Sequence, residues 1–172
     1  MHITKILSFI VTMTFLLFSC IKDDESETIN YINVNSQIPT FAVEDTAGNT
    51  FSSKQFIGKQ SLLVFFGTYC PDCKQVLPVI DEVWKELKDD PRFLLVTISR
   101  KETAEVVSNY WKENQFTMPF YLDTRGEVFS LFANNTIPRI YIINPDNEVV
   151  WMAVESLDIS AKELIQKIKG LK

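Results

Sequence analysis

The sequence predicts an α/β domain built on a mixed β-sheet that helices cover on both faces. Three observations support this fold class. Continuous apolar runs at 61–67 and 93–98 are typical of strands buried on both sides of a sheet. A helical apolar pattern follows each run, and the chain ends in a predicted hairpin and a last helix. A hydrophobic content of 46% suffices for a packed core.

The first half of the domain begins with a predicted β-hairpin extension, in which 41–43 and 49–51 flank a turn at Gly48. The strand at 61–67 leads into a helix that Pro71 opens and Pro78 is expected to kink. Its buried face is predicted to comprise Val76, Leu77, Ile80, Val83, Trp84 and Leu87.

The second half continues with a strand at 93–98 and a helix at 103–114 that Thr103 or a neighbour caps. Its inward side chains are predicted to be Val106, Val107, Tyr110 and Trp111. Next come a short strand at 120–122 and a short helix at 128–132. A hairpin of 140–143 and 148–152 precedes a helix at 159–171, with Leu164, Ile165 and Ile168 facing inward.

Residues 1–19 have the pattern of a signal peptide, because a weakly positive start precedes thirteen mostly apolar residues, too few to span a bilayer. Leu17-Phe18-Ser19-Cys20 resembles a lipobox, which implies cleavage before Cys20 and lipid attachment to its sulfur. A transmembrane anchor or an ordinary signal with an incidental cysteine are the alternatives. Residues 20–36 are polar and acidic and predict a flexible tether, and the domain is expected at 37–172. The run Lys22-Asp23-Asp24 resembles a surface-export signal, with a plain charged tether as the alternative.

Charge and composition exclude several classes of function. The net charge is −5 and no basic cluster is present, which argues against binding of nucleic acid. The single histidine, His2, lies in the predicted signal peptide. A zinc site from Cys70 and Cys73 would need further cysteine or histidine ligands, and a copper site would need a histidine. We therefore expect no metal and no cofactor.

Cys70-Pro71-Asp72-Cys73 is the motif that carries chemistry. The two cysteines are one helical turn apart, after an apolar strand and at a helix start, which brings their sulfurs within disulfide distance. A helix N-terminus stabilises a thiolate at Cys70, and a dithiol there can attack a disulfide and be resolved by its neighbour. An inert structural disulfide is the simpler alternative.

The chain resembles the TlpA/ResA group of thioredoxin-like lipoproteins and periplasmic proteins from about Gln37 to its end. The matching motifs are Ile38-Pro-Thr-Phe41, Gly58-Lys59, Phe65-Phe-Gly-Thr-Tyr-Cys70-Pro-Asp-Cys73, Pro78, Leu122-Asp123, Thr136-Ile-Pro138 and Ile142-Ile-Asn-Pro-Asp146. The resemblance implies a thioredoxin-like fold and a cis-proline, Pro138, that faces the dithiol where substrate chains pair. An ordinary trans proline at a strand entrance is the alternative. The predicted site comprises catalytic Cys70 and Cys73 with substrate-binding Tyr69, Pro71, Asp72, Ile137 and Pro138.

Three positions depart from the group. Thioredoxin has a buried carboxylate where this chain has Val64, and many TlpA/ResA proteins have a glutamate where it has Val76. No buried base is therefore evident, and Asp72 is the nearest carboxylate. Arg139, directly after the expected cis-proline, is unusual; if it reached the sulfurs it would stabilise a thiolate.

The predicted function is an extracytoplasmic thiol–disulfide oxidoreductase, anchored in the cell envelope, that acts on protein disulfides. Asp72 opposes a thiolate at Cys70, so we predict a reductant. Its expected partners are disulfide- or dithiol-containing proteins and an upstream thiol donor such as a membrane electron-transfer protein. A thiol peroxidase is an alternative, although neither cysteine has the threonine or serine and the proline that peroxiredoxins place before theirs. A non-catalytic adaptor that binds extended peptides is another.

Overall fold

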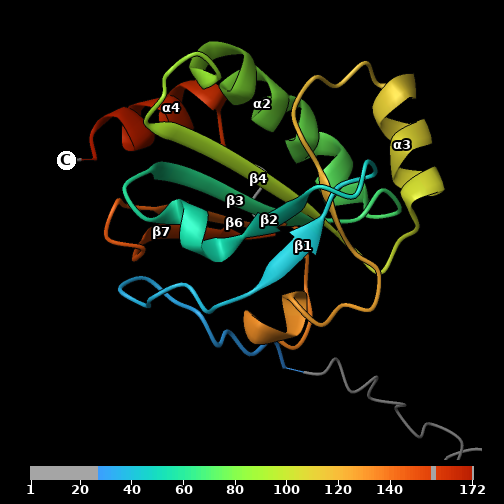
Figure 1. Ribbon diagram of the computed structural model, residues 1–172, viewed down its shortest axis with the longest axis horizontal. Coiled ribbons are helices and arrows are strands. Elements are labelled where there is room, and N and C mark those ends of the chain that lie inside the picture. The colour runs from blue at the N-terminus through green and yellow to red at the C-terminus, as the bar shows by residue number, and fades with distance from the viewer. Residues whose placement is uncertain (1–26, 156–157, 172) are drawn as a thin grey trace, which may run out of the picture.

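A mixed β-sheet forms the centre of the computed structural model, which describes residues 27–155 and 158–171 (Figure 1). In this part of the chain seven strands lie in the order β2-β1-β5-β4-β3-β6-β7. Strands β3, β4 and β5 are parallel, whereas β6 and β7 and the N-terminal hairpin of β1 and β2 pair antiparallel. The strands are Ala42–Glu44, Thr50–Ser52, Gln60–Phe66, Phe93–Arg100, Tyr121–Asp123, Arg139–Ile143 and Val149–Val154, from β1 to β7. The predicted thioredoxin-like sheet and its hairpin extension are confirmed.

Helices cover both faces of this sheet. The α-helices α2 (Pro71–Leu87), α3 (Ala104–Glu113) and α4 (Ala161–Lys169) lie on one side. The 3₁₀ helix η2 (Phe129–Leu131) and the N-terminal segment lie on the other side (Figure 1). A further 3₁₀ helix, η1, covers Ser53–Phe56. Successive side chains of β3 point to opposite faces of the sheet, because Phe65 packs against Phe129 of η2 while Phe66 packs against Trp111 of α3.

Side-chain caps explain where the helices begin. Cys70 caps α2 and Pro71 occupies its first turn, where a missing N–H costs nothing. Thr103 caps α3 as predicted, through a hydrogen bond from the Val106 N–H. Ser160 and Glu163 form a reciprocal capping box at the start of α4.

A few predicted details differ from the structure. Val106 is 47% exposed, because adjacent residues of a helix cannot both face the sheet and Val107 takes the buried position. Trp84, Tyr110 and Ile165 are half-buried rather than buried. The predicted short helix at 128–132 is the 3₁₀ turn η2, too short to close a regular α-helical turn.

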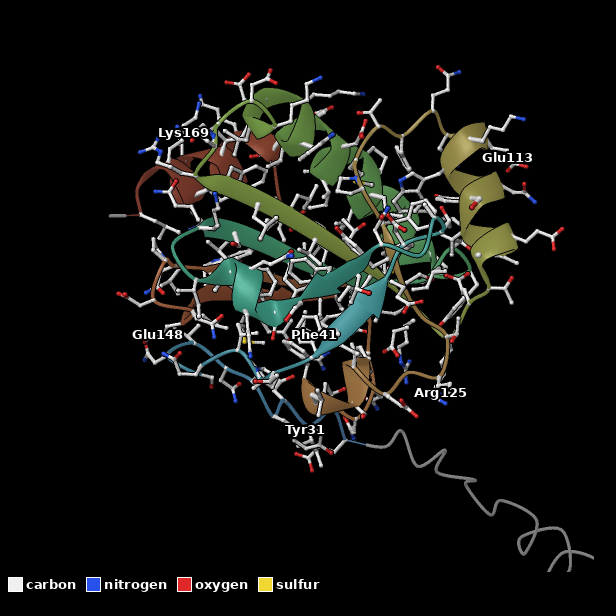
Figure 2. All side chains as sticks on the ribbon, viewed as in Figure 1. Tyr31, Phe41, Glu113, Arg125, Glu148 and Lys169 are labelled. Atoms are coloured by element: carbon white, nitrogen blue, oxygen red, sulfur yellow. The ribbon has the colours of Figure 1, made fainter. Side chains whose placement is uncertain are left out.

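The N-terminal segment, residues 27–36, differs from the flexible tether that its composition predicts. Its side chains are mostly exposed, yet its backbone is hydrogen-bonded to the domain. The N–H groups of Tyr31 and Ile32 donate to the Phe132 carbonyl, and the Asn35 N–H donates to Val149. Tyr31 lies beside η2, below the sheet in Figure 2. A polar segment that is hydrogen-bonded to a domain can have the same composition as a solvated tether. Composition alone therefore could not distinguish the two. The remainder of the predicted tether, and residues 1–19, fall outside the described residues.

Candidate active site

Cys70 and Cys73 meet at the N-terminus of α2, four residues beyond the end of β3. Cys70 Sγ accepts a hydrogen bond from the Cys73 backbone N–H at 3.3 Å. Cys70 is 8% exposed, Cys73 is completely buried, and both are free thiols. An incoming disulfide can therefore reach the sulfur of Cys70 and not that of Cys73.

The environment of Cys73 holds it in the protonated form. Burial raises the pKa of the Cys73 thiol far above its ordinary value of 9.0, and the hydrogen bond with Cys70 adds to the rise. The negative charge of Asp72 acts in the same direction, whereas a hydrogen bond with the Gly67 backbone opposes it. Burial also raises the pKa of Tyr110 on α3. The two thiols thus occupy unequal electrostatic environments.

The loop before β6 faces the dithiol. The Ile137–Pro138 peptide bond is cis, as predicted. The thiol of Cys70 donates to the Ile137 carbonyl, with a sulfur–oxygen distance of 3.5 Å. The exposed Tyr69 ring covers Gly67, where an added Cβ would lie 2.6 Å from the ring and 3.0 Å from Ile137. The structure therefore brings Tyr69, Cys70 and the cis-proline loop together, with Pro71 exposed and Asp72 half-buried on α2.

Arg139 is completely buried on the other side of β6. Its Nε donates to the Thr136 carbonyl and its Nη2 to the Asn135 carbonyl, each at 2.9 Å, and its Nη1 donates to Asn30 Oδ1 at 2.6 Å. Arg139 pairs in register with Phe65, whose ring packs against η2 on the face opposite α2. The guanidinium therefore braces the loop before Pro138 and is directed away from the sulfurs.

A buried carboxylate that the sequence analysis missed stands beside the motif. Glu102 follows the end of β4 and is nine-tenths buried. It accepts hydrogen bonds from the Thr68 N–H at 2.9 Å, the Ser99 hydroxyl at 2.8 Å and the Thr68 hydroxyl. The signal that could have found Glu102 is the presence of two buried apolar runs. If they pair in parallel, their C-terminal ends lie together, as the paired residues Phe66 and Ser99 do here, and so do the residues that follow.

The described residues also bear on metal binding and on membrane crossing. Within 27–155 and 158–171, no three cysteine, histidine, aspartate or glutamate side chains gather in a geometry that could bind a metal ion. In the same residues, no helix combines the length and apolar character needed to cross a membrane.

The fold and the paired cysteines define a thioredoxin-like protein, and comparisons with known proteins place it more closely. A family model described as Redoxin matches residues 33–165. The thiol-disulfide oxidoreductase ResA of Bacillus subtilis is 30% identical over 119 residues, which cover 69% of this chain and 66% of that protein. The crystal structure of StoA from Bacillus subtilis has a TM-score of 0.64 at 25% identity and covers 75% of this chain and 96% of that one. A solution structure from Bacteroides thetaiotaomicron, of a candidate protein disulfide isomerase, reaches a TM-score of 0.76 at 25% identity, covering 81% and 90%.

The chain therefore belongs to the redoxin family, and within it to the TlpA/ResA group. It is an enzyme, a thiol–disulfide oxidoreductase.

Proposed function

We propose that Cys70 and Cys73 are the redox-active pair of an extracytoplasmic, lipid-anchored oxidoreductase that reduces protein disulfides. The observation that carries this proposal is the asymmetry of the two thiols. Cys70 is 8% exposed, and its sulfur accepts a hydrogen bond from the Cys73 N–H. Cys73 is completely buried, and the pKa of its thiol is raised. Such a pair has one attacking and one resolving sulfur.

The reaction follows from this geometry. The Cys70 thiolate attacks one sulfur of a substrate disulfide, forming a mixed disulfide and releasing the second substrate sulfur as a thiolate. Cys73 then gives its proton to the released substrate thiolate or to solvent and attacks Cys70 Sγ. The bond between Cys70 and the substrate breaks, which releases the reduced substrate and leaves a Cys70–Cys73 disulfide. Two electrons pass to the substrate, and an upstream thiol donor, such as a membrane electron-transfer protein, returns the pair to the dithiol.

We infer that an extended polypeptide binds beside Cys70. Tyr69 and Ile137 both lie beside Gly67, and Cys70 Sγ contacts the Ile137 carbonyl next to Pro138. Pro71 and Asp72 follow Cys70 in α2. We assign these five residues to substrate binding. The lipobox at Cys20 supports attachment to the outer face of a membrane, where protein disulfides persist.

The test of this proposal is trapping. A Cys73→Ser variant should accumulate mixed disulfides with substrate proteins, because the resolving sulfur is missing. The matched Cys70→Ser variant should accumulate none, since the remaining sulfur is buried. The unaltered protein should reduce insulin with dithiothreitol as donor and show no comparable consumption of peroxide. Adducts on Cys70→Ser alone would reverse the roles of the two cysteines.

A further inference from the structure

We propose that Glu102 is a positioning residue for Cys70, acting through the turn that joins β3 to α2. This inference rests on the proposed role of Cys70 as the attacking thiol. Among the described residues, no hydrogen bond joins Glu102 to the sulfur of Cys70 or Cys73. It acts through Thr68, which lies two residues before Cys70.

Hydrogen bonds made by Thr68 and Cys70 hold the turn between β3 and α2. The Cys70 N–H donates to the Gly67 carbonyl at 3.1 Å, so 67–70 form a tight turn with Thr68 in its middle. Both polar groups of Thr68 that can donate, its N–H and its hydroxyl, bind the Glu102 carboxylate. Thr68 is 8% exposed, so water does not replace these bonds readily.

The carboxylate is itself held by the sheet. Ser99 lies in β4 opposite Phe66 of β3, and its hydroxyl donates to Glu102 Oε2, the oxygen that also receives the Thr68 N–H. Hydrogen bonds to an ionised acceptor are the stronger kind. Glu102 thereby ties the turn to the rigid centre of the sheet, and this sets where Cys70 Sγ lies relative to the Cys73 N–H and the Ile137 carbonyl.

Glutamine can replace Glu102 without losing these bonds. Its carbonyl can take the place of Oε2 and accept from Thr68 and Ser99, while its amide can donate to the Thr68 hydroxyl, which rotates to accept. Glu102→Ala removes all three bonds. Comparing the two variants therefore separates the effect of holding the turn in place from the effect of the negative charge of Glu102.

The experiment compares the rate of Cys70 alkylation by iodoacetamide and the reduction potential in the unaltered protein, Glu102→Ala and Glu102→Gln. Glu102→Ala should slow alkylation about tenfold, the scale of one lost hydrogen bond to a charged group. Its potential should fall, because a misplaced Cys73 N–H stabilises the thiolate less. Glu102→Gln should keep both values near those of the unaltered protein. Equal losses in both variants, or none in Glu102→Ala, would overturn the proposal.

Two controls separate positioning from general loosening of the fold. Thr103→Ala removes the cap of α3 one residue away and should lower stability without changing alkylation or potential. Thr68→Val should reproduce part of the Glu102→Ala effect and add little to it in the double variant, since both remove the same bond. Additive effects would show that Glu102 does not act through Thr68. Alkylation needs no turnover, so the proposal is tested even if the protein fails to reduce insulin.

Discussion

Asp72 is the residue of the motif whose charge bears on the direction of exchange. Its negative charge contributes to the raised pKa of Cys73, behind burial and the hydrogen bond with Cys70. A charge that disfavours the thiolate destabilises the reduced protein and makes the dithiol a better reductant. Arg139 was the residue most able to cancel this effect, and its guanidinium is engaged on the opposite face of the sheet.

We predict a reduction potential nearer to the thioredoxin value of roughly −270 mV than to the strong-oxidant value of roughly −120 mV. Asp72→Asn should raise the potential, because it removes the opposing charge. Equilibration with glutathione buffers measures both proteins. Glu82→Gln makes the same charge change at an exposed site further along α2 and should leave the potential unchanged. A potential that falls in Asp72→Asn would show that another group sets the redox direction.

Among the helices and strands, α2 is linked to the segment after α3 by a buried carboxylate, that of Asp81. Asp81 Oδ1 accepts from the N–H groups of Thr117 and Met118 at 2.8 and 3.0 Å, and from the Thr117 hydroxyl. Its other oxygen pairs with Lys85 at 2.6 Å. Burial alone would raise the pKa of Asp81, but Lys85 and these donors outweigh it and lower the pKa from 3.8.

Asp81→Ala should lower the free energy of unfolding by about 1–3 kcal/mol at neutral pH, because the buried Met118 N–H and the partly buried Thr117 N–H lose their acceptor. Since the pKa of Asp81 is lower in the folded protein, the stability from its charge is complete above the unfolded pKa of about 4 and is lost as the pH falls through the folded pKa. The difference between the two proteins should therefore shrink in acid. Urea unfolding at neutral and acidic pH measures it, with Asp81→Asn, which keeps an acceptor, as the milder control. A difference that grows in acid would contradict this account.

At the scale of the whole molecule, the sequence predicted the sheet and the helices well. The apolar runs of β3, β4 and β6 are buried along their whole length or nearly so, and such runs leave few alternatives. Contacts between distant polar residues could not be predicted in this way. Glu102 reads as a loop residue before a helix cap, and Arg139 has a partner more than one hundred positions away. Only the register of the strands brings these groups together.

The N-terminal segment provides a test at this scale. A chain shortened to begin at Gln37 should be less stable than one that begins at Glu27, by at least about 2 kcal/mol, because the buried Arg139 loses the Asn30 oxygen. Urea unfolding of the two chains measures the difference. Asn30→Ala in the longer chain should reproduce a large part of it. Equal stability of the two chains would show that the segment only rests on the surface.

The attachment of residues 27–36 also bears on how far from a membrane a lipid-anchored form of the enzyme could work. If Cys20 carries the lipid, as proposed, the stretch of chain that separates the anchor from the first residue attached to the domain runs from residue 20 to residue 27 rather than to residue 37. Its greatest reach is then roughly 25 Å instead of roughly 60 Å, at about 3.5 Å per residue. Substrates would have to present their disulfides within a shallow layer above the lipid surface, so membrane-bound or newly exported proteins would meet the dithiol far more often than freely diffusing ones.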